Sequence, residues 1–131
     1  EYCKTREQFG VAIGSFQALQ HRMVDMFAAC ENVRSLLYRA VCAAQESSPD
    51  ARRSLLALKV MTGRAGRLIG GEAIQLHGGM AMTDELPVGS YVKRLMIINS
   101  LFGDADYHQL LFAQLVNAPV SSAGDAAIKA A

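Results

Sequence analysis

FQALQHRMVDMFAACENVRSLLYRAVCAAQE, residues 16–46, predicts one long helix. Its apolar residues recur in alternating steps of three and four, which places them along one face of a helix. This apolar seam consists of Phe16, Leu19, Met23, Met26, Cys30, Val33, Leu37, Ala40 and Ala44. Ser15 is placed to cap the first turn, and about 30 residues would give a helix roughly 45 Å long. A seam of this length is typical of an antiparallel helical bundle or a coiled coil.

A second helix is predicted after a short break at Ser47-Ser48-Pro49-Asp50. Ser48 can cap it, Pro49 suits its first helical position, and Asp50 complements the positive helix end. We expect this helix to run to about Leu76. Its inward face is expected to consist of Ala51, Leu55, Leu58, Ala65, Ile69, Ala73 and Leu76.

Three glycines recur on this second helix at three- and four-residue steps, namely Gly63, Gly66 and Gly70. In a helix interior each costs about 1 kcal/mol relative to alanine. The cost is offset where a missing side chain lets a neighbouring helix approach closely. The pattern therefore predicts a tight helix crossing rather than a flexible hinge.

The C-terminal third is predicted to contain two further helices. Residues 78–86 form the expected loop, and Pro87 opens a helix over 88–101. Phe102-Gly103-Asp104 interrupts it, and Asp104 can cap a last helix over 105–116. Residues 117–131 are rich in alanine, serine and glycine and lack apolar periodicity, so we expect a flexible tail or one that packs on another subunit.

The N-terminal segment, residues 1–9, is predicted to be helical, although no capping residue stands in front of it. We therefore expect the chain to be a fragment of a longer protein, cut inside a helix that supplies the fourth member of the bundle. No alternation typical of β-strands and no internal repeat is visible. The sequence predicts an all-α, up-and-down four-helix bundle over residues 1–116.

Composition limits the partners of this domain. Of its 131 residues 51% are hydrophobic, which is enough for a core without disulfides or metals. The formal net charge is +1 and the basic residues are dispersed among acids. No uncharged apolar run reaches the roughly 18 residues that span a bilayer. We expect neither a nucleic acid nor a membrane as a partner.

The cysteines and histidines show no spacing typical of a metal site, so we expect no metal. The three cysteines are an odd set without a CxxC pair. Cys30 lies on the apolar seam, where we expect a small buried thiol. Free thiols fit a reducing compartment, so we expect a cytoplasmic protein.

Two polar, glycine-bearing corners lie far apart in the sequence. Arg6-Glu7-Gln8-Phe9-Gly10 stands shortly before Phe16-Gln17, and Gln75-Leu76-His77-Gly78-Gly79 ends the second long helix. A guanidinium can hold two phosphate oxygens at once, and glycines let a ligand approach the backbone. Two structural alternatives remain open: an ion pair of Arg6 with Glu1 or Glu7, and a plain C-cap at the glycines.

The two corners, at this separation, resemble those of the C-terminal helical domain of the acyl-CoA dehydrogenase family of flavoproteins. The resemblance covers residues 1 to about 115. It implies that Arg6, in an R-x-x-F-G motif, contacts the FAD pyrophosphate of a neighbouring subunit. It also implies that the Q-x-x-G-G element beginning at Gln75 meets the adenosine diphosphate end of the same FAD. The FAD contacts implied are Arg6, Gln8, Phe9, Phe16, Gln17, Gln75, Leu76, His77, Gly78 and Gly79.

Two of these residues have a second interpretation. Phe16 also begins the apolar seam, so core packing is an open alternative to a flavin contact. His77 lies inside the Q-x-x-G-G element, where it either touches the cofactor or packs within the protein.

One position departs from the family pattern. Many members carry Y-E-G-T after the helix opened by a P-V element, and that glutamate removes the substrate's α-proton. At the matching place this chain has Leu101-Phe102-Gly103-Asp104, so Phe102 occupies the glutamate position and cannot accept a proton. Asp104 and Asp106 are candidate substitutes, although Asp104 fits a helix cap better. No catalytic residue is therefore expected in this chain.

Two explanations fit this departure. In the first, the base lies in an earlier helix upstream of Glu1. In the second, the chain is a non-catalytic subunit of a bacterial heteromeric dehydrogenase, in which a partner supplies the base. The resemblance implies that the full protein desaturates acyl-CoA thioesters with FAD as a homo- or hetero-oligomer, with a dimer of dimers expected. A helical adaptor without flavin is a third, weaker hypothesis that leaves both corners unexplained.

Overall fold

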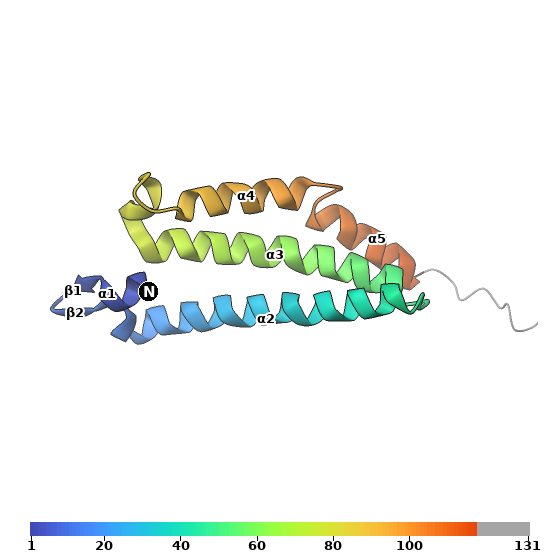
Figure 1. Cartoon of the computed structure of the whole chain (residues 1–131), viewed down its shortest axis with the longest axis horizontal. Helices are drawn as coiled ribbons and strands as arrows, with labels where there is room; N and C mark the ends of the chain where they lie inside the picture. Colours follow the sequence, from blue (N-terminus) through green and yellow to red (C-terminus); the bar gives the residue numbers. More distant parts are fainter. Residues whose placement is uncertain (118–131) are drawn as a thin grey trace, which may run out of the picture.

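The computed structural model describes residues 1–117 as a row of long helices with a small hairpin at the N-terminus (Figure 1). Its elements are α1 (Tyr2–Thr5), β1 (Glu7–Gln8), β2 (Val11–Ala12), the 3₁₀ turn η1 (Ile13–Ser15), α2 (Gln17–Gln45), α3 (Ala51–His77), the 3₁₀ turn η2 (Gly78–Met82), α4 (Val88–Ser100) and α5 (Ala105–Asn117). The expected all-α class is confirmed. Residues 118–131 of the expected tail lie outside the described residues.

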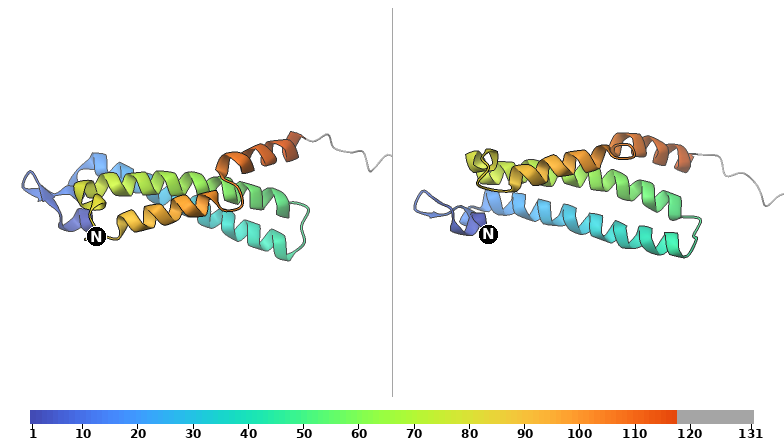
Figure 2. Two further views of the ribbon diagram at one scale, coloured as in Figure 1. Left: turned by 90° about the horizontal axis from the view of Figure 1, so that it is seen from above. Right: turned by 45° about the horizontal axis from the view of Figure 1, so that its top comes forward.

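The central helix is α3, which contacts α2 on one side and both α4 and α5 on the other. Figure 1 and the right-hand view of Figure 2 show this order, with α2 along one edge of the molecule. The direction of the chain alternates from α2 to α3 to α4, and α5 continues in the direction of α4 after a corner. This is the expected up-and-down arrangement. Among the helices of residues 1–117, none is long and apolar enough to cross a bilayer.

The N-terminal segment differs from the prediction, because the helix expected over residues 1–9 ends at Thr5. The chain then forms a two-stranded antiparallel hairpin, with Glu7 opposite Ala12 and Gln8 opposite Val11. Phe9 and Gly10 make its two-residue loop with φ of +57° and +78°, as a tight hairpin turn requires. The predictions of a helix here and of no strand were wrong, since this turn chemistry outweighs local helix propensity.

The apolar seam of α2 is confirmed in part. Leu19, Met23, Met26, Val33 and Ala40 are buried or half-buried, as expected. Three members expected in the core are exposed instead, namely Cys30, Leu37 and Ala44. A strict heptad repeat drifts by about 20° per seven residues around a straight helix. The inward positions therefore move to Ala29, Leu36 and Ala43.

The inward face of α3 is also confirmed in part. Ala65 and Leu76 are buried as expected, whereas Leu55 is exposed. Because α3 is covered on two sides, a single stripe omits part of its buried surface. The buried residues outside the predicted stripe are Ser54, Leu56, Val60, Gly63 and Gly70.

The expected tight crossing is confirmed at the glycines of α3. A Cβ atom added to Gly63 would lie 2.8 Å from the Cβ of Ala105 and would also overlap the Asn99 side chain. At Gly70 an added Cβ would lie 3.4 Å from Val92. The glycines thus let both α4 and α5 lie close to α3.

The predicted caps have mixed outcomes. Asp104 caps α5, because its Oδ1 accepts a hydrogen bond from the Tyr107 backbone N–H at 2.9 Å. Ser15 does not cap α2: the N-cap is Phe16, and the Ser15 hydroxyl donates to the Ala12 carbonyl instead. At α3 the N-cap is Asp50, so Pro49 precedes the helix rather than occupying its first position.

Candidate cofactor-binding groove

The N-terminal segment is attached to the C-terminal end of α3 by an aromatic stack. The Tyr2 ring lies on the His77 imidazole with centroids 4.5 Å apart and planes inclined by 29°. His77 Nδ1 donates to the Ala73 carbonyl oxygen at 2.8 Å, since a carbonyl can only accept. These contacts pack His77 against the N-terminal segment and bring the two polar corners together.

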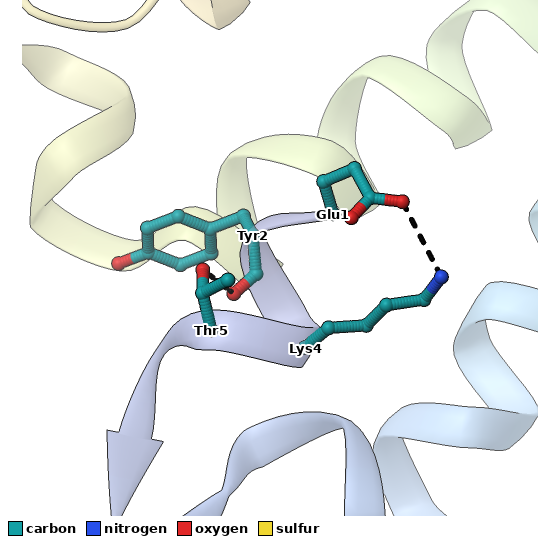
Figure 3. Close-up of polar contacts among 4 residues, drawn as sticks. All are labelled: Glu1, Tyr2, Lys4 and Thr5. Atoms are coloured by element: carbon teal, nitrogen blue, oxygen red, sulfur yellow. Dashed lines mark hydrogen bonds and ion pairs between the residues drawn. The ribbon is translucent and has the colours of Figure 1, made fainter.

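The single turn of α1 is held by its own side chains (Figure 3). Lys4 Nζ lies 3.3 Å from a carboxylate oxygen of Glu1, and the Thr5 hydroxyl donates to the Tyr2 carbonyl at 3.2 Å. The hydrogen bond from Lys4, aided by its positive charge, lowers the pKa of the exposed Glu1 carboxyl. Glu1 is thus engaged with Lys4 and leaves Arg6 without this carboxylate.

A groove of about 670 Å³ runs between the hairpin and the end of α3. Arg6 and Gln8 line it from the hairpin side, and residues 75–79 line it from the helix end. The remaining lining residues are Tyr2, Ile13, Ala18, Leu19, Arg22 and Met80. Two motifs that lie far apart in the sequence therefore face one shared space.

The Arg6 backbone is fixed while its side chain is exposed. Its N–H donates to the Tyr2 carbonyl at 2.9 Å, and its carbonyl accepts from the Ile13 N–H at 2.8 Å. Within residues 1–117 the guanidinium lies within 4 Å of no carboxylate, so the alternative ion pair with Glu1 or Glu7 does not form. Arg6 consequently presents an uncompensated positive charge at the groove.

Arg22 is a groove residue that the sequence analysis missed. Its Nη1 lies 2.9 Å from a carboxylate oxygen of Glu72, and this ion pair joins α2 to α3. Arg22 follows Ala18 and Leu19 by one helical turn, and that spacing could have placed it on the same face. Tyr2, also missed, carries no motif that could have found it.

The glycine pair at the end of α3 borders open space. Gly78 has φ of +57° and ψ of −140°, which a residue with a side chain would resist. Its N–H already bonds to the Gln75 and Ile74 carbonyls, so a C-cap is one of its functions. Cβ atoms added at Gly78 or Gly79 would meet nothing within 4 Å. Packing within residues 1–117 therefore does not explain the lack of a side chain at Gly79.

Three predicted cofactor contacts lie outside this groove. Phe9 is 90% exposed at the hairpin tip, and its ring meets the edge of Phe16 at a centroid distance of 6.1 Å. Phe16 is half-buried and Gln17 is exposed at the start of α2. These residues form a second, aromatic patch beside the hairpin.

The position that the family resemblance assigns to a base lies at the corner between α4 and α5. Phe102 is 94% exposed with φ of +59°, and its carbonyl lies 2.9 Å from His108 Nε2. Lys59 Nζ binds the Ile98, Asn99 and Leu101 carbonyls at 2.7–3.2 Å. Asp104 is engaged as a cap. In the described part of the chain, no three histidine, cysteine or acidic residues gather as a metal site would require.

Comparison with known proteins shows the family of the chain. The family model "Acyl-CoA dehydrogenase, C-terminal domain" matches residues 1–116. The chain belongs to the acyl-CoA dehydrogenase family. Acyl-CoA dehydrogenase IpdE2 of Mycobacterium tuberculosis is 42% identical over 94 residues, which are 72% of this chain and 28% of that protein.

Two solved structures share the fold. The FAD complex of PigA has a TM-score of 0.82 and 31% identity, and the match covers 88% of this chain and 30% of PigA. The Tcur3481-Tcur3483 steroid ACAD has a TM-score of 0.84 and 31% identity over 88% of this chain and 32% of that one. The chain spans less than a third of the length of the curated relatives that it matches.

Proposed function

We propose that the groove between Arg6 and Gln75 holds the pyrophosphate and adenosine part of an FAD that belongs to a neighbouring subunit. The observation that carries this proposal is the shared groove, in which Arg6 has no carboxylate partner within residues 1–117. A guanidinium grips phosphate oxygens in a bidentate manner. The FAD complex of the similar protein PigA supports the choice of ligand.

The groove residues fit such a ligand in charge and in shape. Arg6 would bind phosphate oxygens, and the Gln75 side chain can both donate and accept hydrogen bonds. The bare backbone at Gly79 would let the nucleotide approach closely. Gln8, Leu76 and the edge of His77 would complete the lining. Arg22 would contribute less, because Glu72 already compensates its charge.

The aromatic patch of Phe9, Phe16 and Gln17 would meet the flavin end of the cofactor. An aromatic side chain that is 90% exposed, on a hairpin with a left-handed Phe9 backbone, is suited to contact with another molecule. In this arrangement Arg6 would contact the phosphates and Phe9 would contact the flavin ring, and both residues belong to the same short N-terminal segment.

The whole protein would oxidise acyl-CoA thioesters by α,β-desaturation in the cytoplasm, as an oligomer such as a dimer of dimers. FAD, when bound, would accept the hydride that the substrate loses. This chain's residues would bind and orient the cofactor and support subunit packing. Support for this reaction comes from membership of the family and from the similarity to IpdE2, and the three free cysteines suit a reducing compartment.

A second candidate function is a non-catalytic subunit of a heteromeric dehydrogenase. Phe102 favours it, because a phenyl ring cannot accept a proton and Asp104 is engaged as a cap. The fold similarity to the Tcur3481-Tcur3483 steroid ACAD is compatible with this function.

Titration of the chain with ADP, followed by two-dimensional NMR, tests the groove. We expect shifts at the amides of residues 6–8 and 75–79, and loss of these shifts in Arg6→Gln. Arg67→Gln, which removes an exposed arginine outside the groove, is the matched control and should leave them in place. Shifts confined to other regions, or equal effects of both substitutions, would contradict the proposal.

An activity assay separates the two candidate functions. The full-length protein would be tested for acyl-CoA oxidation with an artificial electron acceptor. The assay would be run with this protein alone and with candidate partner subunits added. Activity of the protein alone would eliminate the non-catalytic function. Activity that appears only with a partner would favour it.

A further inference from the structure

One ion pair joins two long helices at the wall of the groove, where α2 and α3 run side by side (Figure 1). Arg22 Nη1 on α2 lies 2.9 Å from Glu72 Oε2 on α3. The other two ion pairs within residues 1–117 link residues three positions apart, and neither contains a groove residue. The side chains of Arg22 and Glu72 are 45% and 26% exposed, so a ligand in the groove can reach them. The pair therefore acts on the charge of a molecule that enters the groove.

The groove contains two guanidinium groups, but only one of them is free to bind an anion. Arg6 has no carboxylate within 4 Å in residues 1–117, whereas Glu72 compensates the charge of Arg22. Glu7 precedes Gln8 on β1, and successive residues of a strand point to opposite faces, so Glu7 points away from the groove that Gln8 lines. The groove thus offers one site for a phosphate group rather than two.

The proposed function gives this difference a consequence, because the enzyme would meet two molecules with the same adenosine diphosphate unit. FAD contains this unit as a pyrophosphate diester. CoA contains it too, with an additional phosphate on the 3′ oxygen of the ribose. Such a phosphate monoester adds a charge of about −1.5 to −2 near pH 7. A groove that recognised only adenosine and pyrophosphate would bind both molecules, and the substrate would compete with the cofactor.

We propose that Glu72 makes the groove select the adenosine diphosphate of FAD against that of CoA, by occupying Arg22 and repelling the 3′-phosphate. This inference rests on the proposed function, since it needs a nucleotide in the groove. Arg6 binds the pyrophosphate, which both molecules share. The 3′-phosphate of CoA needs a second cation, but Arg22 already holds a carboxylate at 2.9 Å. Discrimination of this kind depends on a repulsive group as well as an attractive one.

CoA and dephospho-CoA test the proposal, because the two molecules differ only in the 3′-phosphate. Each is titrated into the 131-residue chain with a reductant present, and two-dimensional NMR gives the dissociation constant and the residues contacted. In the wild type, dephospho-CoA should shift the amides of residues 6–8 and 75–79. CoA should bind there about 5- to 10-fold more weakly, as expected for like charges at a partly exposed site.

Substitution of each member of the ion pair should move this selectivity in opposite directions. Glu72→Gln releases the Arg22 guanidinium for a phosphate, so CoA should bind at least as tightly as dephospho-CoA. Arg22→Gln leaves the Glu72 carboxylate without its partner, so the preference for dephospho-CoA should widen by a further factor of about 3 or more. If the pair served only to join α2 to α3, both substitutions would change the two affinities in parallel and leave their ratio unchanged.

The ion pair between Glu31 and Arg34 provides a matched control. Arg34 Nη1 lies 2.6 Å from Glu31 Oε1 on α2, and neither residue lines the groove. Glu31→Gln removes the same charge as Glu72→Gln and also breaks an ion pair. It should leave the ratio of the two dissociation constants within about 2-fold of the wild type, because an exposed pair outside the groove has little effect on it. Circular dichroism and urea unfolding show whether each variant is folded.

The titrations distinguish failure of this inference from failure of the proposed function. If dephospho-CoA leaves residues 6–8 and 75–79 unshifted in every variant, the groove is not a nucleotide site, and both are overturned. If dephospho-CoA binds in the groove but the wild type binds CoA equally well, or Glu72→Gln keeps the wild-type ratio, only the selection by Glu72 is refuted.

Discussion

The ring of Tyr2 stacks on the imidazole of His77 with a centroid distance of 4.5 Å, although 75 positions separate the two residues. This stack is the main side-chain link between the hairpin segment, which carries Arg6, and the end of α3, which carries Gln75. The Tyr2 hydroxyl adds only a long contact of 3.4 Å to the His77 carbonyl. The shape of the groove therefore depends on an aromatic contact that neither motif contains.

Removal of this ring should release the N-terminal segment. For Tyr2→Ala we expect a loss of about 1–2 kcal/mol in the free energy of unfolding, from the stack and from lost burial. Backbone amides of residues 6–13 should also exchange faster with deuterium. Tyr2→Phe keeps the ring and should change stability by less than about 0.5 kcal/mol. Equal losses in the two variants would show that the hydroxyl, rather than the stack, holds the segment.

Two glycines of α3 make a matched pair for a test of the tight crossing. Gly63→Ala should destabilise the protein by about 1–2 kcal/mol, because its Cβ would lie 2.8 Å from the Cβ of Ala105. Gly71→Ala should instead stabilise it by up to about 1 kcal/mol, since its Cβ meets nothing within 4 Å and alanine favours the helix. Urea unfolding measures both. A stabilising Gly63→Ala would refute the close approach.

Much of the fold could be predicted, because the long helices carry a strong apolar periodicity. The helix ends predicted at Leu76 and Leu101 each differ by one residue from the observed ends of α3 at His77 and of α4 at Ser100. The hairpin could not be predicted by the same means. Its strands have two residues each, and its turn places Phe9 at a positive φ that phenylalanine rarely adopts.

The candidate groove was predictable where a motif exists and not elsewhere. Arg6 and Gln75 were identified through the family resemblance, and the structure brings both to one groove. Tyr2 and Arg22 contribute through packing and an ion pair that depend on the tertiary arrangement. Phe9, Phe16 and Gln17 lie outside this groove, so their contact with the cofactor stays a prediction.

Lys59 should control the corner between α4 and α5. Its ammonium group binds three of the last four carbonyls before the corner, those of Ile98, Asn99 and Leu101. For Lys59→Met we expect a loss of about 1.5–3 kcal/mol, as for hydrogen bonds to a charged group, and faster amide exchange over residues 100–104. Lys93→Met, at an exposed lysine of α4, is the control and should have little effect. Unchanged exchange at the corner would show that other contacts hold it.

Substitutions of Asp104 distinguish a role as helix cap from a role as catalytic base. Its Oδ1 accepts the Tyr107 N–H at 2.9 Å, so Asp104→Ala should cost about 0.5–2 kcal/mol in the free energy of unfolding. Asp104→Asn retains an oxygen acceptor and should cost only a few tenths of a kcal/mol. Asp106→Ala, at an exposed residue of the same first turn, is the control for general charge loss.

The same variants distinguish stability from chemistry in the complete enzyme assay. If Asp104 serves only as a cap, Asp104→Asn should retain the acyl-CoA oxidation rate of the wild type, because the amide keeps the cap but cannot act as a base. A stable Asp104→Asn protein that loses activity by about 100-fold or more would instead identify Asp104 as a proton acceptor, since removal of a general base commonly costs that much. Asp104 would then act as the base in place of the glutamate that many family members have at the position of Phe102, two residues earlier.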